Sequence, residues 1–371
     1  MKRAIVSVIN DLSTDQRVHK HCTMLIELDY EVLLIGRALK SSVPLEDRAY
    51  KTHRMKLPFE KGPLFYATYN IGLFFHLLFR KTDLLFSNDL DTLIPNYLIS
   101  RLKGKSLVYD SHEYFTEVPE LVNRPFVQRF WKRLESWILP KLKHTVTVNA
   151  SIASLYKKDF GIEMNVVRNI PKCGQSVIAK KSREELKLPI DKKLIILQGS
   201  GINIDRGAEE AVLAMKNVDA ILLILGSGDV VDILKKMVAN HDLESKVIFK
   251  ARMPYQEMMA HTLVADLGLT LDKDTNINYR FSLPNKLFDY IHAGIPVLAS
   301  DLVEVKRVVE EFDIGDIVDE VSPGAISTKM NEMLNSSKTE TWKRNCQSAK
   351  TQLNWENESK VLKDVIAQID G

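Results

Sequence analysis

The sequence predicts an α/β protein of two domains, each built around a parallel β-sheet. Short apolar runs rich in β-branched residues alternate with amphipathic segments of helical length, which is the pattern of βαβ units. The rhythm occurs twice along the 371 residues, a length that suits two domains better than one. Hydrophobic residues make up 45% and charged residues 27% of the chain, which is the balance of a folded globular protein.

Each half of the chain is expected to contribute six strands to its sheet. Those of the first half occupy residues 4–9, 31–35, 84–87, 106–109, 145–148 and 165–167. Those of the second half occupy residues 194–198, 220–225, 247–250, 267–271, 296–299 and 316–318. A polar stretch containing proline and glycine separates the two series and predicts domains of residues 1–175 and 176–354. Residues 355–371 have apolar residues at helical spacing and predict a C-terminal helix, whose packing back on the first domain is left open.

Composition and charge exclude several classes of function. The formal charge is only +3, from 51 basic and 48 acidic residues, so no overall field attracts nucleic acid and we expect no such partner. Cys22, Cys173 and Cys346 form no Cys-x-x-Cys pair, which argues against a zinc site or a disulfide framework and favours the cytoplasm. The first apolar run, residues 4–9, is too short for a signal peptide, and residues 71–79 fall far short of the roughly 20 that span a membrane.

A glycine-bearing loop follows the first strand of the second half, at the sheet edge where parallel α/β folds bind ligands. It contains Gly199, Ser200, Gly201 and Arg206. Glycines let backbone N–H groups approach an anion, and the helix expected from about residue 208 adds a positive dipole. Arg206 would complete a diphosphate cradle. The alternative is a tight turn with a surface arginine.

A second turn of small residues follows the next strand of the second half. It consists of Gly226, Ser227 and Gly228. Such a turn could contact a phosphate, but a Gly-x-Gly pair also permits close packing of a helix against a strand. The two interpretations carry equal weight.

The most specific stretch lies further along the second half and combines a cation with a carboxylate. It contains Ser282, Leu283, Pro284, Asn285, Lys286 and Asp289. Pro284 suits a first helical turn and Ser282 an N-cap, so we expect a helix with outward-pointing amides. Lys286 and Asp289 are three residues apart and share one helix face. A nucleoside diphosphate needs this combination, because cation and amides suit phosphate and a carboxylate accepts hydrogen bonds from ribose. The alternative is an ordinary surface Lys and Asp.

Polar residues also follow the first strand of the first half. Asn10, Asp15 and Arg17 occupy a strand end where a ligand is expected. Asp15 and Arg17 could contact an acceptor or the sugar diphosphate. The alternative for this segment is capping of the first helix by Ser13 or Thr14.

A histidine between two acidic residues follows the strand at residues 106–109. Asp110, His112 and Glu113 lie in this segment. An imidazole there could donate a hydrogen bond to a sugar hydroxyl or position an acceptor, and the alternative is a structural histidine. The Asp-x-Asp pairs at residues 89–91 and 272–274 lack the context of a metal site, so we expect no metal.

An apolar segment, residues 63–80, is rich in aromatic side chains. A helix of this kind can rest on a membrane surface. Its polar face lacks lysines, so we expect burial in the core of the first domain and leave peripheral contact with the inner face of a membrane as the alternative.

The glycine loop ending in Arg206, the Gly226 turn and the run Ser-x-Pro-Asn-Lys-x-x-Asp-Tyr-x-x-Ala-Gly-x-Pro-Val from Ser282 together resemble the retaining glycosyltransferases of family 4, of the group 1 type. The resemblance covers essentially the whole chain and is strongest over residues 195–301. It implies a GT-B fold, in which two Rossmann-like domains with parallel sheets face an interdomain cleft. The first domain would bind the acceptor and the second the nucleotide sugar.

The resemblance also implies roles for single residues. Arg206 and Lys286 would contact the donor diphosphate, Asp289 the ribose and His112 the transferred sugar. The implied catalytic residues are His112, Glu113, Arg206 and Lys286, and the implied acceptor-binding residues are Asn10, Asp15, Arg17 and Asp110. One position departs from the family, because Phe281 stands where many members have a glutamate that contacts the sugar.

The expected reaction is transfer of a sugar, with retention, from a UDP or GDP sugar to a hydroxyl of a saccharide or lipid-linked saccharide. Cell-envelope or exopolysaccharide synthesis is the expected setting, without a cofactor or metal. The alternatives are a GT-B epimerase or phosphorylase and, because of Phe281, a non-catalytic protein that binds nucleotide sugars.

Overall fold

The structure is a computed structural model that describes residues 1–13, 15–40, 42, 44–173 and 180–370. The chain forms two compact units. Unit 1 comprises Met1–Asn169 together with the residues from Ser359 onward, and unit 2 comprises Ile170–Glu358. The boundary expected between residues 175 and 176 lies outside the described residues, and the observed division falls between Asn169 and Ile170.

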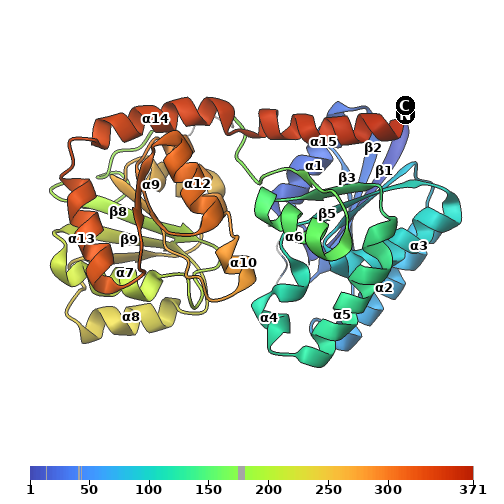
Figure 1. The fold of residues 1–371 in the computed structure, drawn as a ribbon, viewed down its shortest axis with the longest axis horizontal. Helices are drawn as coiled ribbons and strands as arrows, with labels where there is room; N and C mark the ends of the chain where they lie inside the picture. The colour runs from blue at the N-terminus through green and yellow to red at the C-terminus, as the bar shows by residue number, and fades with distance from the viewer. Residues whose placement is uncertain (14, 41, 43, 174–179, 371) are drawn as a thin grey trace. The chain divides into compact units, whose positions relative to one another are not determined.

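Unit 1 is built around a parallel sheet (Figure 1). Over the described residues its strand order is β3-β2-β1-β4-β5-β6-β7. The strands are β1 (Lys2–Asp11), β2 (Tyr30–Ala38), β3 (Lys51–Lys56), β4 (Leu84–Asn88), β5 (Ser106–Ser111), β6 (His144–Thr147) and β7 (Asn165–Val166). The six expected strands are confirmed. The sequence did not reveal β3, which is an edge strand with one buried side chain and therefore no apolar run.

Helices connect the strands of unit 1. They are α1 (Gln16–Glu27), α2 (Pro63–Leu78), α3 (Leu93–Lys103), α4 (Pro119–Val122), α5 (Pro125–Ile138) and α6 (Ala150–Phe160), with 3-10 turns η1 (Leu90–Thr92), η2 (Phe115–Glu117) and η3 (Leu139–Lys141). The expectation that residues 63–80 are buried is right for only one face of α2. Phe65, Tyr69 and Leu73 are buried, whereas Ile71 and Phe75 on the opposite face are exposed.

Unit 2 contains a second parallel sheet, with the order β10-β9-β8-β11-β12-β13 over the described residues. Its strands are β8 (Lys193–Gly199), β9 (Ala220–Gly226), β10 (Val247–Lys250), β11 (Leu267–Thr270), β12 (Val297–Ser300) and β13 (Gly315–Val318). Its helices are α7 (Ala208–Ala214), α8 (Val231–Asn240), α9 (Tyr255–Thr262), α10 (Ile277–Arg280), α11 (Asn285–Ala293), α12 (Val303–Phe312), α13 (Pro323–Leu334) and α14 (Thr339–Gln352), with the turn η4 (Met215–Asn217). All six strands expected in this half are confirmed.

The sheet of unit 2 is covered on both faces, which explains why its strands are largely apolar instead of alternating between apolar and polar residues. Successive side chains of β8 alternate between two separate core clusters. Ile195 and Leu197 pack with α7, α8 and α13, whereas Leu194 and Ile196 pack with α9, α11 and α12. The predicted pair of Rossmann-like α/β domains is therefore confirmed.

The C-terminal helix α15 (Trp355–Asp370) is divided between the two units. Its first residues belong to unit 2, where the Trp355 amide donates to the Pro171 carbonyl at 2.9 Å. Its later residues belong to unit 1, where the Tyr30 hydroxyl donates to Asp370 at 2.6 Å. Over the described residues, no helix has both the length and the apolar character needed to span a bilayer.

Both sheets have a point at which the strand order reverses. It lies between β1 and β4 in unit 1 and between β8 and β11 in unit 2. Ligands of open α/β sheets bind at the carboxyl ends of the strands beside such a point, so the loops after these four strands are where a site is expected.

Candidate functional site

Two cations share one carboxylate at the reversal point of unit 2. Arg206 follows β8, Asp272 follows β11, and Lys286 lies in the first turn of α11. The Arg206 Nη1 donates to Asp272 Oδ2 at 2.8 Å, and the Lys286 Nζ lies 3.7 Å from Asp272 Oδ1. Burial lowers the pKa of Lys286, an effect that Asp272 opposes and Arg206 reinforces. Because Asp272 is buried, it fixes both cations at the edge of the sheet.

Polar groups in and beside the cluster of Arg206, Asp272 and Lys286 have hydrogen-bonding positions that the described residues leave unfilled. The Arg206 guanidinium lies over the Tyr279 ring, with its central carbon 4.6 Å from the ring centroid. The Arg206 Nε and the Ser282 hydroxyl are buried and have no partner among the described residues. Buried polar groups are almost always hydrogen-bonded, so these groups favour a polar ligand at this position.

Asp289 lies on the same helix as Lys286 and is held by two donors. The Gln198 amide donates to one carboxylate oxygen at 3.0 Å, and the Tyr255 hydroxyl donates to the other at 2.9 Å. The Thr262 hydroxyl in turn donates to Gln198 at 2.6 Å. Burial and the Asp289 charge raise the pKa of Tyr255, so its hydroxyl keeps its proton. Asp289 is therefore a carboxylate of fixed orientation three residues from the cation cluster.

The start of α11 differs from the sequence-based expectation. Pro284 is the N-cap, with φ −71° and ψ 141°, so it lies before the first helical turn rather than in it. Ser282 is not the cap, and no side chain caps this helix. The physical reason is that proline fixes φ but leaves ψ undetermined, so it fits an extended position as readily as a helical one. The first-turn amides of Asn285 and Lys286 consequently have no side-chain cap.

The glycine turns of unit 2 serve loop packing. A Cβ at Gly226 would lie 1.8 Å from the Gly199 carbonyl oxygen, and one at Gly228 would lie 2.1 Å from the Ile202 carbonyl oxygen. The two loops are also joined by a hydrogen bond from the Ser227 amide to the Gly199 carbonyl at 3.1 Å. At Gly226 and Gly228 a side chain would therefore meet the backbone at the end of β8 and in the loop after it, rather than a helix packed against a strand. Contact of this turn with a phosphate stays a prediction.

The remaining predicted donor-binding residues lie around these loops. Ser200, Gly201 and Asn285 are exposed, and Leu283 packs against the core. Gly199 and Gly201 have room for a Cβ at ordinary contact distances. Gly207, at the start of α7, has φ +71° and lies against the Leu271 carbonyl.

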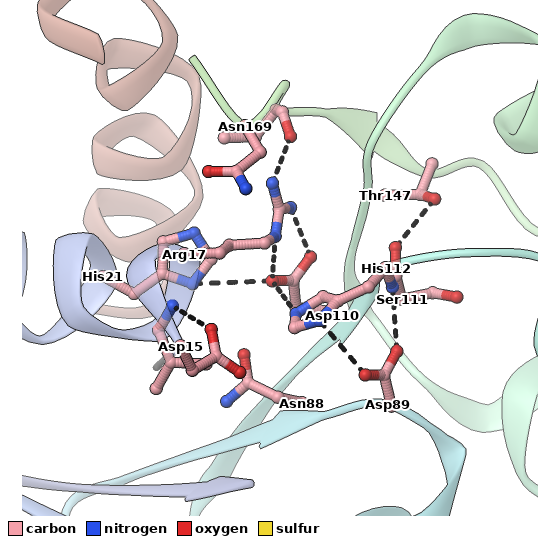
Figure 2. A network of polar contacts seen from close by, with 12 residues as sticks. Asp15, Arg17, His21, Asn88, Asp89, Asp110, Ser111, His112, Thr147 and Asn169 are labelled. Atoms are coloured by element: carbon pink, nitrogen blue, oxygen red, sulfur yellow. Dashed lines mark hydrogen bonds and ion pairs between the residues drawn. The ribbon is translucent and has the colours of Figure 1, made fainter. Parts of the chain in front are cut away.

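Polar side chains at or after the ends of β1, β4 and β5 form a cluster in unit 1, here called the unit 1 cluster, with a buried ion pair at its centre (Figure 2). Arg17 donates from Nε and Nη2 to the two oxygens of Asp110, at 2.8 and 2.6 Å. Its Nη1 donates to the Val167 carbonyl at 2.7 Å. The Arg17 and Asp110 side chains are only 4% and 0% exposed. These two of the four residues predicted to bind an acceptor therefore bind each other inside unit 1.

His112 lies between two carboxylates, as Figure 2 shows. Its Nε2 is 3.1 Å from Asp110 and its Nδ1 is 3.1 Å from Asp89, which also accepts a hydrogen bond from the His112 amide at 2.9 Å. Burial lowers the pKa of His112, but Asp89 and Asp110 outweigh it and raise the pKa well above its usual value. His112 is therefore a fixed imidazolium, with both ring N–H groups in ion pairs.

Asp89 is a residue that the sequence did not single out except as part of a rejected metal motif. Its φ of 59° and ψ of 165° fall in a region that is almost restricted to glycine and costs on the order of 1–3 kcal/mol. Burial and the neighbouring Asp89 raise the pKa of Asp91, and the His112 charge opposes this shift. The described residues contain no group of three or more His, Cys, Asp or Glu side chains arranged so that they could hold a metal ion.

The loop after β1 ends in a helix cap made by a residue that the sequence offered as a ligand contact. Asp15, rather than Ser13, caps α1 by accepting from the Val18 amide at 3.1 Å. The other expected cap, Thr14, lies outside the described residues. Asn10 donates to Asp15 at 3.2 Å, and Ser13 donates to Asp11 at 2.8 Å.

Glu113 differs from its neighbours in the unit 1 cluster. Its side chain is exposed, and its backbone carbonyl accepts a hydrogen bond from Ser111 at 2.6 Å. The carboxylates that hold His112 are therefore Asp89 and Asp110, whereas the sequence placed Asp110 and Glu113 beside it.

Comparisons with known proteins match each half of the chain to a domain family. Residues 180–349 match the family of glycosyl transferases group 1, and residues 15–172 match Glycosyltransferase Family 4. No curated protein matches the chain in sequence.

Solved structures share the architecture over the full length. A sucrose-phosphate synthase from Thermosynechococcus elongatus has a TM-score of 0.78 at 14% identity, covering 100% of this chain and 99% of that one. A glycosyltransferase from Rickettsia africae has a TM-score of 0.75 at 12% identity, covering 99% and 98%. Anabaena HepE in complex with UDP-glucose has a TM-score of 0.74 at 14% identity, covering 100% of both chains.

Proposed function

Because the chain is a glycosyltransferase with the GT-B fold, we propose that it transfers a sugar from a nucleotide-diphosphate donor to an acceptor hydroxyl. The observation that carries the proposal is the convergence of Arg206 and Lys286 on Asp272. Two cations beside the uncapped amides of α11 suit a diphosphate, which carries several negative charges on closely spaced oxygens.

In this mechanism the diphosphate is the leaving group. Negative charge builds on it as the bond to the sugar breaks, and Arg206 and Lys286 stabilise that charge in the transition state. Asp272 holds the cations in place before the donor arrives, so little reorganisation is required. The two protein cations take the part that a metal ion plays elsewhere, and we propose a metal-independent reaction with retention at the sugar carbon.

The nucleoside would be recognised by Asp289. Its orientation is fixed by Gln198 and Tyr255, and a carboxylate accepts hydrogen bonds from ribose hydroxyls. Because HepE is described in complex with UDP and with UDP-glucose, we propose a UDP sugar as the first donor to test, with GDP sugars second. Phe281 stands where many members of the family have a glutamate that contacts the sugar. The identity of the transferred sugar is therefore left to the donor panel described below.

In unit 1, the imidazolium of His112 is the group proposed to act on the substrates. Asp89 and Asp110 occupy both ring nitrogens, so His112 contributes a fixed positive charge rather than a transferable proton. The proposed acceptor is a saccharide or lipid-linked saccharide of a cell-envelope or exopolysaccharide pathway.

The test is incubation of the full chain with a panel of UDP and GDP sugars, with and without saccharide acceptors, followed by NMR of the products. Transfer to an acceptor with release of free nucleoside diphosphate is the expected result, and the anomeric signal reports retention. Conversion of a donor in the absence of acceptor would indicate an epimerase. Tight donor binding with no turnover across the panel would indicate a non-catalytic binding protein.

A further inference from the structure

Exposed aromatic side chains concentrate on two helices of unit 1. On α2, Ile71, Phe75 and Phe79 follow one another at four-residue spacing and point to solvent, opposite the buried stripe that faces the sheet. On α5, Phe126, Phe130 and Trp137, spaced by four and then seven residues, also point to solvent. These six side chains, here called the outer apolar surface, are between 49% and 83% exposed. Surface helices normally present polar residues outward. Both helices instead present apolar residues to solvent as well as to the core.

The helices that carry the outer apolar surface are neighbours. Tyr66 of α2 packs edge-on against Trp131 of α5 with ring centroids 5.6 Å apart. Tyr97 of α3 packs in the same way against Trp137 of α5, at 5.7 Å. Figure 1 shows α2, α3 and α5 together beside the sheet of unit 1. Leu102 of the neighbouring helix α3 is also exposed. An exposed apolar area of this kind marks an interaction site.

The charge around α5 is strongly basic. Residues 121–143 contain six exposed cations, which are Arg124, Arg129, Lys132, Arg133, Lys141 and Lys143. The one acidic residue in this stretch, Glu135, is buried, and burial raises its pKa to about 8. Lys132 is paired with Glu117 at 2.6 Å. The Lys141 ammonium lies 4.8 Å from the centroid of the Trp137 ring, so aromatic and cationic groups are interleaved.

We propose that the outer apolar surface binds an anionic lipid bilayer, with its aromatic side chains among the acyl chains and the α5 cations against the headgroups. Aromatic residues flanked by Lys and Arg are the composition of interfacial helices. A second copy of the chain fits less well, because a symmetric contact would bring the same cations of α5 against each other. The proposal is independent of the donor site in unit 2.

The test is flotation of the full chain with vesicles of phosphatidylcholine alone or mixed equally with phosphatidylglycerol. Binding to the anionic vesicles is expected, with weaker binding to the neutral ones and at high salt, because salt screens the charge attraction. The triple variant Phe126→Ser, Phe130→Ser and Trp137→Ser should lower the partition coefficient by more than about a hundredfold. The control Ile190→Ser, an exposed apolar residue of unit 2, should bind like the wild type.

A second variant separates the charge contribution from folding. Arg129→Gln with Arg133→Gln keeps every apolar group and should weaken binding to anionic vesicles while leaving binding to neutral vesicles unchanged. Circular dichroism and UDP binding of all variants report folding. Absence of wild-type flotation on anionic vesicles, or equal flotation of the triple variant, would overturn the proposal. A concentration-dependent dimer that the triple variant loses, without vesicle binding, would assign the surface to a second copy instead.

Discussion

Glu135 allows a stability prediction whose magnitude follows from its surroundings. The side chain lies on α5 and is 0% exposed. The Tyr156 hydroxyl lies 3.5 Å from Oε1, and Oε2 has no partner among the described residues. Burial raises the pKa of Glu135 from its usual 4.5 to about 8. The native state therefore holds this proton more tightly than the unfolded chain does.

The sign and size of the effect follow from proton linkage. Stability contributed by the protonated carboxyl is fully present below about pH 4.5 and is lost as the pH rises through 8. One pKa unit corresponds to about 1.4 kcal/mol, so the total loss is roughly 5 kcal/mol, of which roughly 3 kcal/mol is already lost at pH 7. Glu135→Gln keeps the shape of the protonated acid and has no proton to lose.

The assay is urea unfolding of wild type and Glu135→Gln at several pH values, followed by tryptophan fluorescence. The free energy of unfolding of the variant should exceed that of the wild type by an amount that grows by about 3–5 kcal/mol between pH 5 and 9. Glu163→Gln is the control, because Glu163 is 79% exposed and its replacement should give a difference independent of pH. A difference for Glu135→Gln that is equally flat would refute the reasoning.

Four further substitutions test the glycine loops of unit 2 and the surroundings of His112 in unit 1. Gly226→Ala should destabilise unit 2 by about 1–3 kcal/mol, because its φ is +139° and the added Cβ would lie 1.8 Å from the Gly199 carbonyl. Gly199→Ala should lower the midpoint of thermal unfolding by less than Gly226→Ala does. Equal midpoints for the two variants would contradict the argument that a Cβ at Gly226 meets the backbone. Asp89→Asn should lower the pKa of His112, because it removes the charge of one of the two neighbouring carboxylates. Turnover should then fall at alkaline pH while donor affinity is retained. An unchanged pH–rate profile would count against a role for the His112 charge in turnover. His112→Ala should reduce kcat without changing the donor Kd, and wild-type kinetics would make His112 structural.

The fold could be predicted from the sequence because each buried strand shows as a run of apolar residues that are neighbours in the chain. Runs such as residues 194–198 are apolar on both faces of a covered sheet, so they stand out from the surrounding segments. β3 (Lys51–Lys56) could not be found in this way, because an edge strand needs few apolar residues. Pro284 shows a second limit, since its fixed φ is compatible with both the expected helical turn and the observed cap.

The candidate site was predictable only in part. Arg206 could be chosen because it follows a strand end, and Lys286 and Asp289 because they share one face of the helix that starts near Pro284. Each has a chemistry that suits a diphosphate or a ribose. Asp272 and Tyr255 could not, because their contacts depend on which strands and helices become neighbours in space. The contacts that hold His112 have the same origin, because Asp89 lies 23 residues earlier in the chain and directly follows β4, the strand that pairs with β5.

If Arg206 and Lys286 bind the diphosphate of the donor, calorimetric titration of UDP into wild type, Arg206→Ala and Lys286→Ala will show the loss of each cation as weaker binding. Each substitution should weaken binding by about 1.5–3 kcal/mol, which is a Kd about ten to more than a hundred times higher. Lys235→Ala, which removes an exposed lysine of α8, should leave the Kd unchanged. Wild-type affinity in both Arg206→Ala and Lys286→Ala would contradict the account.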